Sequence, residues 1–236
     1  MRVLVTGSSG KVGQAAVSEL LAHGHAVVAA DQRRPAAELP DGDVRFVETD
    51  LGDVGQVAGA MAGCDAVIHL GAIPSPYGHA DEVVFVNNVR ATFATLQAAS
   101  LLGVGKAVIA SSLSALGTAW APEPFAPLYA PVDEAHPFVI KDAYGLSKEV
   151  DERTGEMFHR RTGMQIVALR FSWVATAEEA RAQAAAIAAD PRQGDWWRLL
   201  WGYVDVRDAA AICRLGIEVD VDRVRRFSEA WWTIEA

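Results

Sequence analysis

The chain has 236 residues, which is enough for one α/β domain or for a domain with a small appended lobe. About half of the residues are hydrophobic (51%) and 22% are charged, as in an ordinary soluble globular protein. The formal charge of −9 at pH 7 argues against nucleic acid or an anionic membrane as the main partner, because both attract basic patches.

The first half of the chain alternates short apolar runs with amphipathic segments. The apolar runs, rich in β-branched residues, predict buried strands over Val3–Thr6, Ala26–Ala30, Val44–Val47, Ala66–Leu70 and Ala107–Ala110. The amphipathic segments predict helices over Val12–Ala22, Val54–Met61 and Asp81–Leu102. Strands that alternate with helices pair in parallel through right-handed crossovers, so we expect an α/β fold with a doubly wound parallel sheet of Rossmann type.

Regular structure in the second half begins only after a long loop. Prolines recur between Pro122 and Pro137, so we expect a surface loop from Leu113 to Asp142, and long loops of this kind are often functional. Beyond the loop, the sequence predicts a helix over Ala143–Thr162, a strand over Gln165–Phe171, a helix opened by a capping box of Thr176 and Glu179 and closed by Asp190-Pro191, a strand over Tyr203–Val206 and a helix from about Asp208.

The domain organisation follows from the absence of a repeat or a clean linker in the sequence. We expect one Rossmann-type domain over residues 1–236, with about 172–203 and 216–236 forming a small substrate cap. The first of these segments contains Trp196, Trp197 and Trp201, which either pack the cap onto the sheet or stack on a substrate ring.

The sequence favours a cytoplasmic protein. The first apolar run, Val3–Val5, is too short for a signal peptide or a membrane span. The two cysteines, Cys64 and Cys213, lie in apolar surroundings, which favours reduced core thiols over a disulfide. The scattered histidines show no metal-ligand spacing, so no metal is expected.

A glycine-rich turn joins the first predicted strand to the first predicted helix. Glycines at such a turn let the backbone approach a pyrophosphate, and the helix N-terminus offers free N–H groups and a partial positive charge. In this strand–turn–helix setting a dinucleotide site is favoured over an ordinary turn. The expected cofactor contacts of the turn are Gly7, Ser9, Gly10, Lys11, Val12 and Gly13.

The end of the second predicted strand bears on the choice of cofactor. Asp31, with Gln32 beside it, is placed to accept hydrogen bonds from a ribose diol, and this favours NAD over NADP. Arg33 and Arg34 follow at once. They lie in a solvated loop or, alternatively, hold the 2′-phosphate of NADP, so NADP stays possible.

The third and fourth predicted strands are each followed by a short segment that fits the same site. Asp50-Leu51 fits the adenine edge, although Asp50 could equally cap the helix that follows. Leu70-Gly71-Ala72 ends the fourth strand with small residues, which leave room for the backbone of the cofactor.

A phenol and an amine share one face of a predicted helix, because Tyr144 and Lys148 are four residues apart. An isolated tyrosine holds its proton too firmly to be an efficient general base at neutral pH. A nearby ammonium favours the phenolate, which makes the pair a usable acid or base, and Lys148 can also hold ribose hydroxyls. By itself this spacing is common, and it usually marks two surface residues.

Two serines lie just past the fifth predicted strand. Ser111-Ser112 falls at the carboxyl edge of the sheet, where open α/β folds bind ligands. A hydroxyl there can bond the reacting oxygen and stabilise charge as it develops. The alternative is a turn or cap serine, but its coincidence with the glycine turn and the Tyr144–Lys148 pair favours a site.

Together these elements resemble the extended short-chain dehydrogenases/reductases, the NAD-dependent epimerase/dehydratase family. The resemblance covers most of the chain, and its motifs are jointly specific. The matching stretches are Thr6-Gly7-x-x-Gly10-x-x-Gly13, Asp31, Asp50-Leu51, His69-Leu70-Gly71-Ala72, Asn87-Asn88-Val89, Ser111-Ser112, Tyr144-x-x-x-Lys148, Leu169-Arg170 and Tyr203-Val204-Asp205-Val206-Arg207-Asp208.

The resemblance implies that Ser112, Tyr144 and Lys148 form a catalytic trio. Ser112 is preferred to Ser111 because the family's serine stands five residues before a glycine, here Gly117. Tyr144 and Lys148 would also contact the cofactor.

The resemblance implies further site residues. Asn88 corresponds to an asparagine next to the family's active site, and Phe171 and Ser172 follow the strand whose end meets the nicotinamide. Ser114, Ser172 and the catalytic Ser112 are expected to contact substrate. Arg170 is a candidate to hold an anionic group of the substrate, unless it only pairs with a nearby carboxylate.

Some positions depart from the family pattern. Leu116 replaces the usual tyrosine before Gly117, and Ala91 replaces a glycine. The segment after Asp208 is short compared with the lobe of sugar-nucleotide epimerases, which favours a small substrate. The uronate dehydrogenases are similar in this reduced lobe, but Leu113-Ser114 stands where they tend to have a more polar pair.

We therefore expect an NAD-dependent oxidoreductase that transfers a hydride at a hydroxyl-bearing carbon of a sugar, sugar acid or similar small molecule, with Tyr144 as general acid/base. The alternative is a nucleotide-sugar epimerase/dehydratase, in which the hydride returns. A nucleotide-sensing regulator ranks third, because Tyr144 and Lys148 are both present. The resemblance also implies a homodimer, formed by two helices of each subunit, one of which carries Tyr144 and Lys148.

Overall fold

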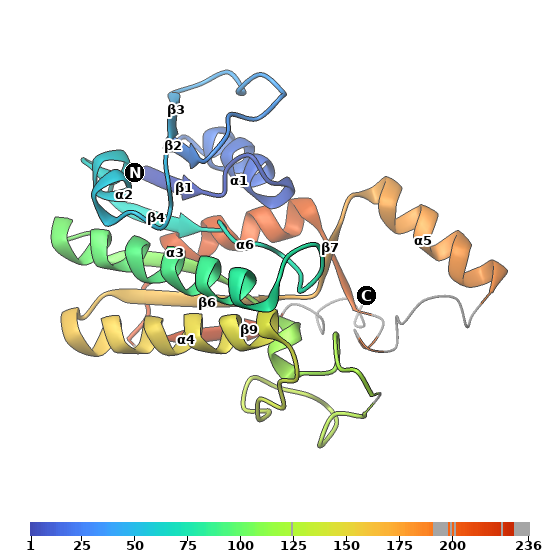
Figure 1. Cartoon of the computed structure of the whole chain (residues 1–236). Coiled ribbons are helices and arrows are strands. Elements are labelled where there is room, and N and C mark those ends of the chain that lie inside the picture. The colour runs from blue at the N-terminus through green and yellow to red at the C-terminus, as the bar shows by residue number, and fades with distance from the viewer. Residues whose placement is uncertain (124, 191–197, 199, 201, 223, 229–236) are drawn as a thin grey trace.

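A computed structural model describes residues 1–123, 125–190, 198, 200, 202–222 and 224–228 of the chain. Its main feature is a parallel sheet in the order β3-β2-β1-β4-β5-β6-β9 (Figure 1). The strands are β1 (Arg2–Thr6), β2 (Ala26–Asp31), β3 (Val44–Glu48), β4 (Ala66–His69), β5 (Lys106–Ser112), β6 (Gln165–Phe171) and β9 (Arg225–Ser228). The doubly wound Rossmann-type fold expected from the sequence is confirmed.

Helices cover both faces of this sheet (Figure 1). On one face α3 packs against α2 and α4, and on the other α1 packs against α6. These helices are α1 (Lys11–Ala22), α2 (Val54–Met61), α3 (Asp81–Leu102), α4 (Ala143–Thr162) and α6 (Val206–Glu218). Alternate residues of β1 serve the two layers: Leu4 belongs to the core under α2–α4, whereas Val3 and Val5 belong to the core under α1 and α6.

The strand order creates the crevice in which the site lies. β1 has β2 on one side and β4 on the other, so the chain winds away from β1 in two directions. In open α/β sheets, ligands bind at such a switch point, outside the carboxyl ends of the strands. The segments that follow β1, β2, β4, β5 and β6 all meet at this edge.

The fifth strand is longer than the sequence indicates. β5 continues through Ser111 to Ser112, and in its register with β6 Ser111 lies opposite Arg170 and Ser112 opposite Phe171. Cross-strand pairing extends the strand beyond its apolar run. Ser112 and Phe171 are thereby fixed side by side at the carboxyl edge.

The long loop expected from Leu113 to Asp142 begins with a short 3-10 helix, η1 (Leu113–Leu116). Gly117 ends this helix with φ +89°, and a Cβ on it would lie 1.9 Å from the carbonyl oxygen of Val139. Only glycine fits there. Farther along, buried His136 accepts a hydrogen bond from the backbone N–H of Leu128 at 3.0 Å, which ties the loop to itself.

The structure describes part of the expected cap. β7 (Trp173–Ala175) and β8 (Tyr203–Asp205) form a separate parallel pair, and α5 (Ala177–Ala189) projects from the body of the molecule (Figure 1). The capping box of Thr176 and Glu179 is confirmed.

The assignment of residues 216–236 to the cap is wrong for the part that the structure describes. The last turn of α6 packs on the sheet and β9 extends the sheet as its edge strand. Of the cap tryptophans, Trp196, Trp197 and Trp201 lie outside the described residues, as does the end of the second segment. In the described part of the chain, no helix is long and apolar enough to span a membrane.

Candidate active site

Two cavities lie along the carboxyl edge of the sheet and share Gly7, Gly10, Leu70 and Ala72 in their walls. The first has a volume of about 580 Å³ and extends from the glycine-rich turn to Asp31 and Asp50. The second has a volume of about 480 Å³ and extends to β5, α4 and β7. A ligand bound along the glycine-rich turn would therefore contact the walls of both cavities.

Most of the site residues expected from the sequence line these cavities. The first is lined by Gly7, Gly10, Asp31, Gln32, Asp50, Leu51, Leu70, Gly71 and Ala72. The second is lined by Gly7, Gly10, Lys11, Val12, Gly13, Leu70, Ala72, Ser112, Ser114, Tyr144, Lys148, Phe171 and Ser172. Ser9, Asn88 and Arg170 are expected site residues that line neither cavity.

The glycine-rich turn is shaped by close backbone contacts. A Cβ on Gly13 would lie 2.1 Å from the carbonyl oxygen of Gly7, and Gly7 itself has φ +68°. Gly10 differs, because the nearest atom to its Cβ would be the same carbonyl oxygen at 3.3 Å. Packing within the protein therefore demands glycine far more strongly at position 13 than at position 10. Gly10 lines both cavities. The space at Gly10 is a cradle that a side chain would fill, and it fits the phosphates of a dinucleotide.

Asp31 is held at the end of β2 by the glycine-rich turn. Its carboxylate accepts a hydrogen bond from the backbone N–H of Ser9 at 3.0 Å and lines the first cavity. The Ser9 hydroxyl donates to the carbonyl oxygen of Arg33 at 2.5 Å, so Ser9 supports the loop instead of lining the site. The side chain of Arg34 lies over the ring of Phe46, and both Arg33 and Arg34 are exposed.

The structure resolves the two alternatives for Asp50. The cap of α2 is Asp53, whose carboxylate accepts from the backbone N–H of Gln56 at 3.0 Å. Asp50 accepts instead from the backbone N–H of Gly52 at 2.9 Å and lines the first cavity beside Leu51. Asp50 is therefore placed for a ligand, and the helix-cap interpretation is wrong.

Lys11, an expected cofactor contact, links the glycine-rich turn to α5. Its ammonium forms an ion pair with Glu179 at 2.7 Å and donates to the carbonyl oxygen of Val174 at 3.3 Å. This interaction lowers the pKa of the Glu179 carboxyl. Lys11 lines the second cavity from this position.

The two serines at the end of β5 have separate partners. Ser111 donates to Glu152 Oε1 at 2.6 Å in the interior. The hydroxyl oxygen of Ser112 accepts from the backbone N–H of Ser114 at 3.0 Å, and its own proton is available toward the second cavity. The preference for Ser112 over Ser111 is supported by this difference, because the hydroxyl proton of Ser111 is already donated.

Tyr144 and Lys148 face the second cavity from α4, which begins at its cap Asp142. The ammonium of Lys148 lies 5.8 Å from the centre of the Tyr144 ring and donates to the carbonyl oxygen of Ala110 at 2.9 Å. Burial by itself would lower the pKa of Lys148, but Asp151, Tyr144 and Glu152 together outweigh it, with the charge of Asp151 the largest of the opposing effects, and the pKa is raised.

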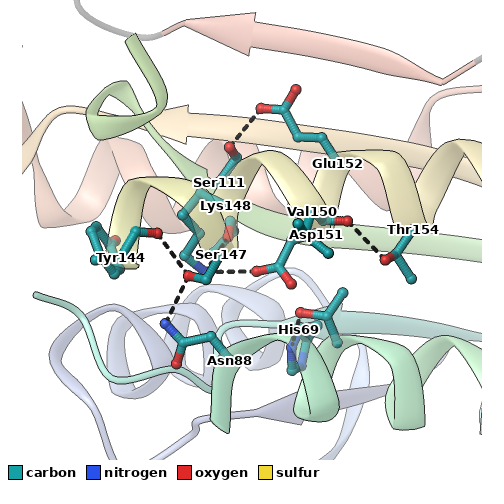
Figure 2. A network of polar contacts seen from close by, with 12 residues as sticks. His69, Asn88, Ser111, Tyr144, Ser147, Lys148, Val150, Asp151, Glu152 and Thr154 are labelled. Atoms are coloured by element: carbon teal, nitrogen blue, oxygen red, sulfur yellow. Dashed lines mark hydrogen bonds and ion pairs between the residues drawn. The ribbon is translucent and has the colours of Figure 1, made fainter. Parts of the chain in front are cut away.

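Asn88 was expected among the catalytic residues, and the structure gives it a positioning role instead. Its carbonyl oxygen accepts from the backbone N–H of Ile73 at 2.8 Å, and its amide donates to the carbonyl of Ile73 and to the Ser147 hydroxyl, each at 3.1 Å. Asn88 thus joins the loop after β4 to α4 (Figure 2). With its amide buried and bonded in this way, it is not presented to a ligand.

The expectation that Arg170 holds a substrate anion is also wrong. Its guanidinium makes two hydrogen bonds to Glu152, at 2.8 and 2.9 Å, and a third to the carbonyl oxygen of Glu134 at 3.2 Å. Arg170 is 1% exposed. A buried guanidinium needs such partners to offset the loss of water. This pair also holds Ser111 through Glu152 and fastens β6 to α4.

His69 is a satisfied structural histidine. Its ring nitrogens contact the hydroxyls of Thr6 at 2.7 Å and Thr92 at 3.1 Å. Burial, together with the charge of Lys148, lowers the pKa of His69 to about 3, so the ring is neutral. It ties β4 to β1 and α3 below the site.

Several cavity residues were not predicted from the sequence. Trp120 lines the second cavity and donates its indole N–H to the Ser114 hydroxyl at 3.0 Å. Arg90 lines the first cavity and donates to the carbonyl oxygen of Gly52 at 2.8 Å. The proline-rich loop was a signal for Trp120, but nothing in its spacing selected this tryptophan. The buried hydroxyl oxygen of Ser172 lacks a hydrogen-bond partner among the described residues, which fits a contact with a ligand.

A model of the family described as "NAD dependent epimerase/dehydratase family" matches residues 3–223. The chain belongs to this family. Membership agrees with the topology of the sheet and with the arrangement of the glycine-rich turn, Asp31, Ser112, Tyr144 and Lys148 around the two cavities.

Similar proteins within this epimerase/dehydratase group differ in activity. L-arabinose 1-dehydrogenase (NAD(P)(+)) of Haloferax volcanii is 31% identical over 185 residues, which is 76% of this chain and 70% of that protein. UDP-glucose 4-epimerase of Corynebacterium glutamicum is 28% identical over 187 residues, 75% of this chain but only 52% of that protein. The matched region thus spans about half of the epimerase.

A solved structure shows the same architecture. MoeE5 in complex with UDP-glucuronic acid and NAD aligns with a TM-score of 0.77 and 26% identity, covering 98% of this chain and 76% of that chain. The NAD-dependent epimerase/dehydratase fold therefore extends over nearly the whole of the present chain.

Proposed function

We propose that this protein is an NAD-dependent oxidoreductase that acts on a hydroxyl-bearing carbon of a small sugar or sugar-like substrate. The observation that carries the proposal is the meeting of Ser112, Tyr144 and Lys148 in one cavity whose wall continues into the glycine-rich turn. One site can then hold a dinucleotide and place an alcohol beside an acid/base pair.

The cofactor would be held along the first cavity and into the second. The backbone at Gly10 and the N-terminus of α1 would receive the pyrophosphate, and Asp31 would accept hydrogen bonds from the adenosine ribose. This ribose contact supports NAD over NADP, while Arg33 and Arg34, exposed beside it, are the groups that NADP would use. NAD, when bound, supplies the hydride acceptor.

The reaction itself would use three side chains. Tyr144 takes the proton of the substrate hydroxyl during oxidation and returns it during reduction. The Lys148 ammonium favours the tyrosinate by its positive charge and is placed to hold ribose hydroxyls. Ser112 donates a hydrogen bond to the substrate oxygen and keeps it near Tyr144.

The nature of the substrate is supported by the walls of the second cavity. The hydroxyls of Ser114 and Ser172 offer hydrogen bonds, and Trp120 offers a flat apolar surface of the kind on which a sugar ring can lie. The similarity to L-arabinose 1-dehydrogenase supports a sugar that is oxidised without a nucleotide attached.

A second function is favoured by the similarity to UDP-glucose 4-epimerase. In an epimerase or dehydratase the hydride returns to the substrate, so reduced cofactor does not accumulate. The same three side chains would serve both reactions. Release of NADH during turnover therefore separates the two functions.

We further propose that the protein works as a cytoplasmic homodimer. Both cysteines are buried, as is usual for core thiols of proteins in a reducing compartment. Large apolar side chains are exposed on the neighbouring helices α3 and α4, among them Phe93 and Leu146 at 43% and 42% exposure. Pairing of these helices with a second copy would cover them.

The first test combines cofactor binding with turnover. NAD and NADP are titrated by calorimetry, and sugars, sugar acids and nucleotide sugars are screened by the absorbance of reduced cofactor. We expect Tyr144→Phe to bind NAD normally and to lower kcat/KM by roughly 10²- to 10⁴-fold, because it keeps the ring but loses the proton-transfer group. Tyr203→Phe, at an exposed tyrosine outside both cavities, is the matched control and should behave as wild type.

Each outcome of this test has a definite meaning. NADH production that Tyr144→Phe abolishes supports the dehydrogenase. Conversion of a nucleotide sugar without net NADH supports the epimerase. If neither nucleotide binds, or if Tyr144→Phe turns over as fast as Tyr203→Phe, the proposal is wrong.

A further inference from the structure

The ammonium of Lys148 lies against the carboxylate of Asp151 on α4. This carboxylate is distinct from that of Glu152, which holds Arg170. Asp151 Oδ2 is 3.2 Å from Lys148 Nζ, and the two residues are three positions apart on the helix. Their side chains are 1% and 3% exposed. The motifs that mark the glycine-rich turn and the Tyr144–Lys148 pair give Asp151 no role.

The contacts of Lys148 fix its ammonium between a helix and a strand. Asp151 holds it from α4 (Figure 2). The carbonyl oxygen of Ala110 holds it from β5 at 2.9 Å. Between these two restraints, the ammonium stays near the Tyr144 ring and at the wall of the second cavity.

The other ionisable groups around Asp151 are occupied or neutral. Glu152, the next residue of α4, is bonded to Arg170 of β6 and receives the Ser111 hydroxyl of β5. From β4 comes His69, which is uncharged at neutral pH because its pKa is about 3. Thr92 of α3 bonds to the His69 ring, and it favours the charged form of Asp151. Asp151 is therefore the anion that directly contacts the Lys148 ammonium.

A lysine buried to this degree loses its hydration, and this favours the neutral amine. The contrary effects of Asp151, Tyr144 and Glu152 together restore the charged form, as the raised pKa of Lys148 indicates, and the charge of Asp151 is the largest of the three. Burial also raises the pKa of the Asp151 carboxyl, which the Lys148 charge opposes. Each member of the pair thus depends on the other to remain charged.

We propose that Asp151 is a positioning residue of the active site: its carboxylate holds the Lys148 ammonium beside Tyr144 and sets the pH range in which these two residues work. The proposal deepens the oxidoreductase function and rests on it for the kinetic test. A negative charge favours the protonated form of each acid near it. Its removal therefore makes the Lys148 ammonium easier to deprotonate, and this moves the alkaline limb of the activity profile toward lower pH.

The kinetic test compares Asp151→Asn with Glu149→Gln. The first removes the buried charge at nearly constant shape, and the second removes a charge from the solvent side of the same helix, where Glu149 lies near Arg153. We expect the profile of kcat/KM against pH to shift toward lower pH by on the order of one unit in Asp151→Asn. The profile of Glu149→Gln should coincide with that of wild type. A profile for Asp151→Asn that also coincides with wild type would overturn the proposal.

A double-mutant cycle on thermal unfolding tests the pair without activity. The four proteins are wild type, Lys148→Met, Asp151→Asn and the double variant. We expect Asp151→Asn to lower the unfolding midpoint much more when Lys148 is present than when Met replaces it, because only then is a buried ammonium left without its counter-ion. Equal losses in both backgrounds would overturn the proposal.

The cycle also covers two further cases. Should Asp151→Asn fail to fold while the double variant folds, the dependence of the Lys148 ammonium on Asp151 is supported directly. Should no substrate be found, the oxidoreductase function fails by its own test, and the cycle still decides whether Asp151 holds Lys148.

Discussion

At the scale of single residues, Gly10 and Gly13 belong to the same turn but are required to different degrees by the protein's own packing. At position 13 a Cβ would overlap the carbonyl oxygen of Gly7 at 2.1 Å, so the turn could not keep its shape. At position 10 the corresponding distance is 3.3 Å, which the backbone can relieve by a small shift. The stricter demand at position 10 would come from a bound phosphate group.

This difference makes a prediction for Gly10→Ala. The variant should unfold within about 2 °C of wild type, because the strain within the protein is small, a few tenths of a kcal/mol. Its affinity for NAD should fall at least about tenfold, since the methyl group projects into the space that the phosphates need. Thermal unfolding and calorimetric titration measure the two effects.

Gly59→Ala is the matched control, because a Cβ on Gly59 in α2 would meet nothing within 4 Å. It should leave NAD affinity unchanged. Unaltered affinity in Gly10→Ala would show that the dinucleotide does not pass this turn closely.

Residue roles at the site were predictable where a role depends on the nearest neighbours in the chain. The glycine spacing and the four-residue interval between Tyr144 and Lys148 are of this kind. The role of Arg170 is different, because its partner Glu152 lies on another element and reaches it only through packing. Sequence alone could not distinguish an arginine that holds substrate from one that fastens α4 to β6.

At the scale of elements, Lys11 and Glu179 connect the start of α1 with the start of α5. Glu179 has two functions there, since it accepts from the Thr176 backbone N–H at 2.8 Å in the capping box and pairs with Lys11. The pair is about 40% exposed on each side, so its contribution to overall stability should be below about 1 kcal/mol. Its effect should instead be local to α5.

We therefore predict that Glu179→Gln speeds hydrogen exchange in the α5 amides and leaves the unfolding temperature nearly unchanged. Glutamine keeps an oxygen for the capping box but carries no charge for Lys11. Glu178→Gln removes an exposed charge from the adjacent position and serves as the control. Equal exchange in the two variants would contradict a specific link between α5 and the glycine-rich turn.

The long helices and the buried strands were predictable because each carries its own periodic apolar pattern. α2, α3 and α4 begin and end where the sequence indicates. β7 and β9 were missed, and both form by pairing with other strands, β7 with β8 and β9 with β6. The length of β5 was also decided by its partner, which draws Ser111 and Ser112 into the strand.

At the scale of the whole molecule, the exposed apolar side chains of α3 and α4 should decide the oligomeric state. We predict that Phe93→Asp converts the homodimer to a monomer, because a carboxylate at a buried helix–helix interface would be desolvated without a partner. Light scattering coupled to gel filtration measures the mass directly.

Leu215→Asp is the matched control, since Leu215 is 45% exposed on α6, on the opposite face of the sheet. It should remain dimeric. A wild-type chain that is monomeric at micromolar concentration, or a Phe93→Asp variant that stays dimeric, would contradict this interface.

The sequence by itself determined the Rossmann-type layers, the dinucleotide turn and the Tyr144–Lys148 pair, because these depend on periodicity and on residues a few positions apart. Only the tertiary structure decided that Asn88 and Arg170 fasten elements together, that Asp50 faces a cavity and that Asp151 lies against Lys148. These roles depend on which groups lose their water on folding and which partner each then meets. Packing between distant segments, and not local sequence, sets both.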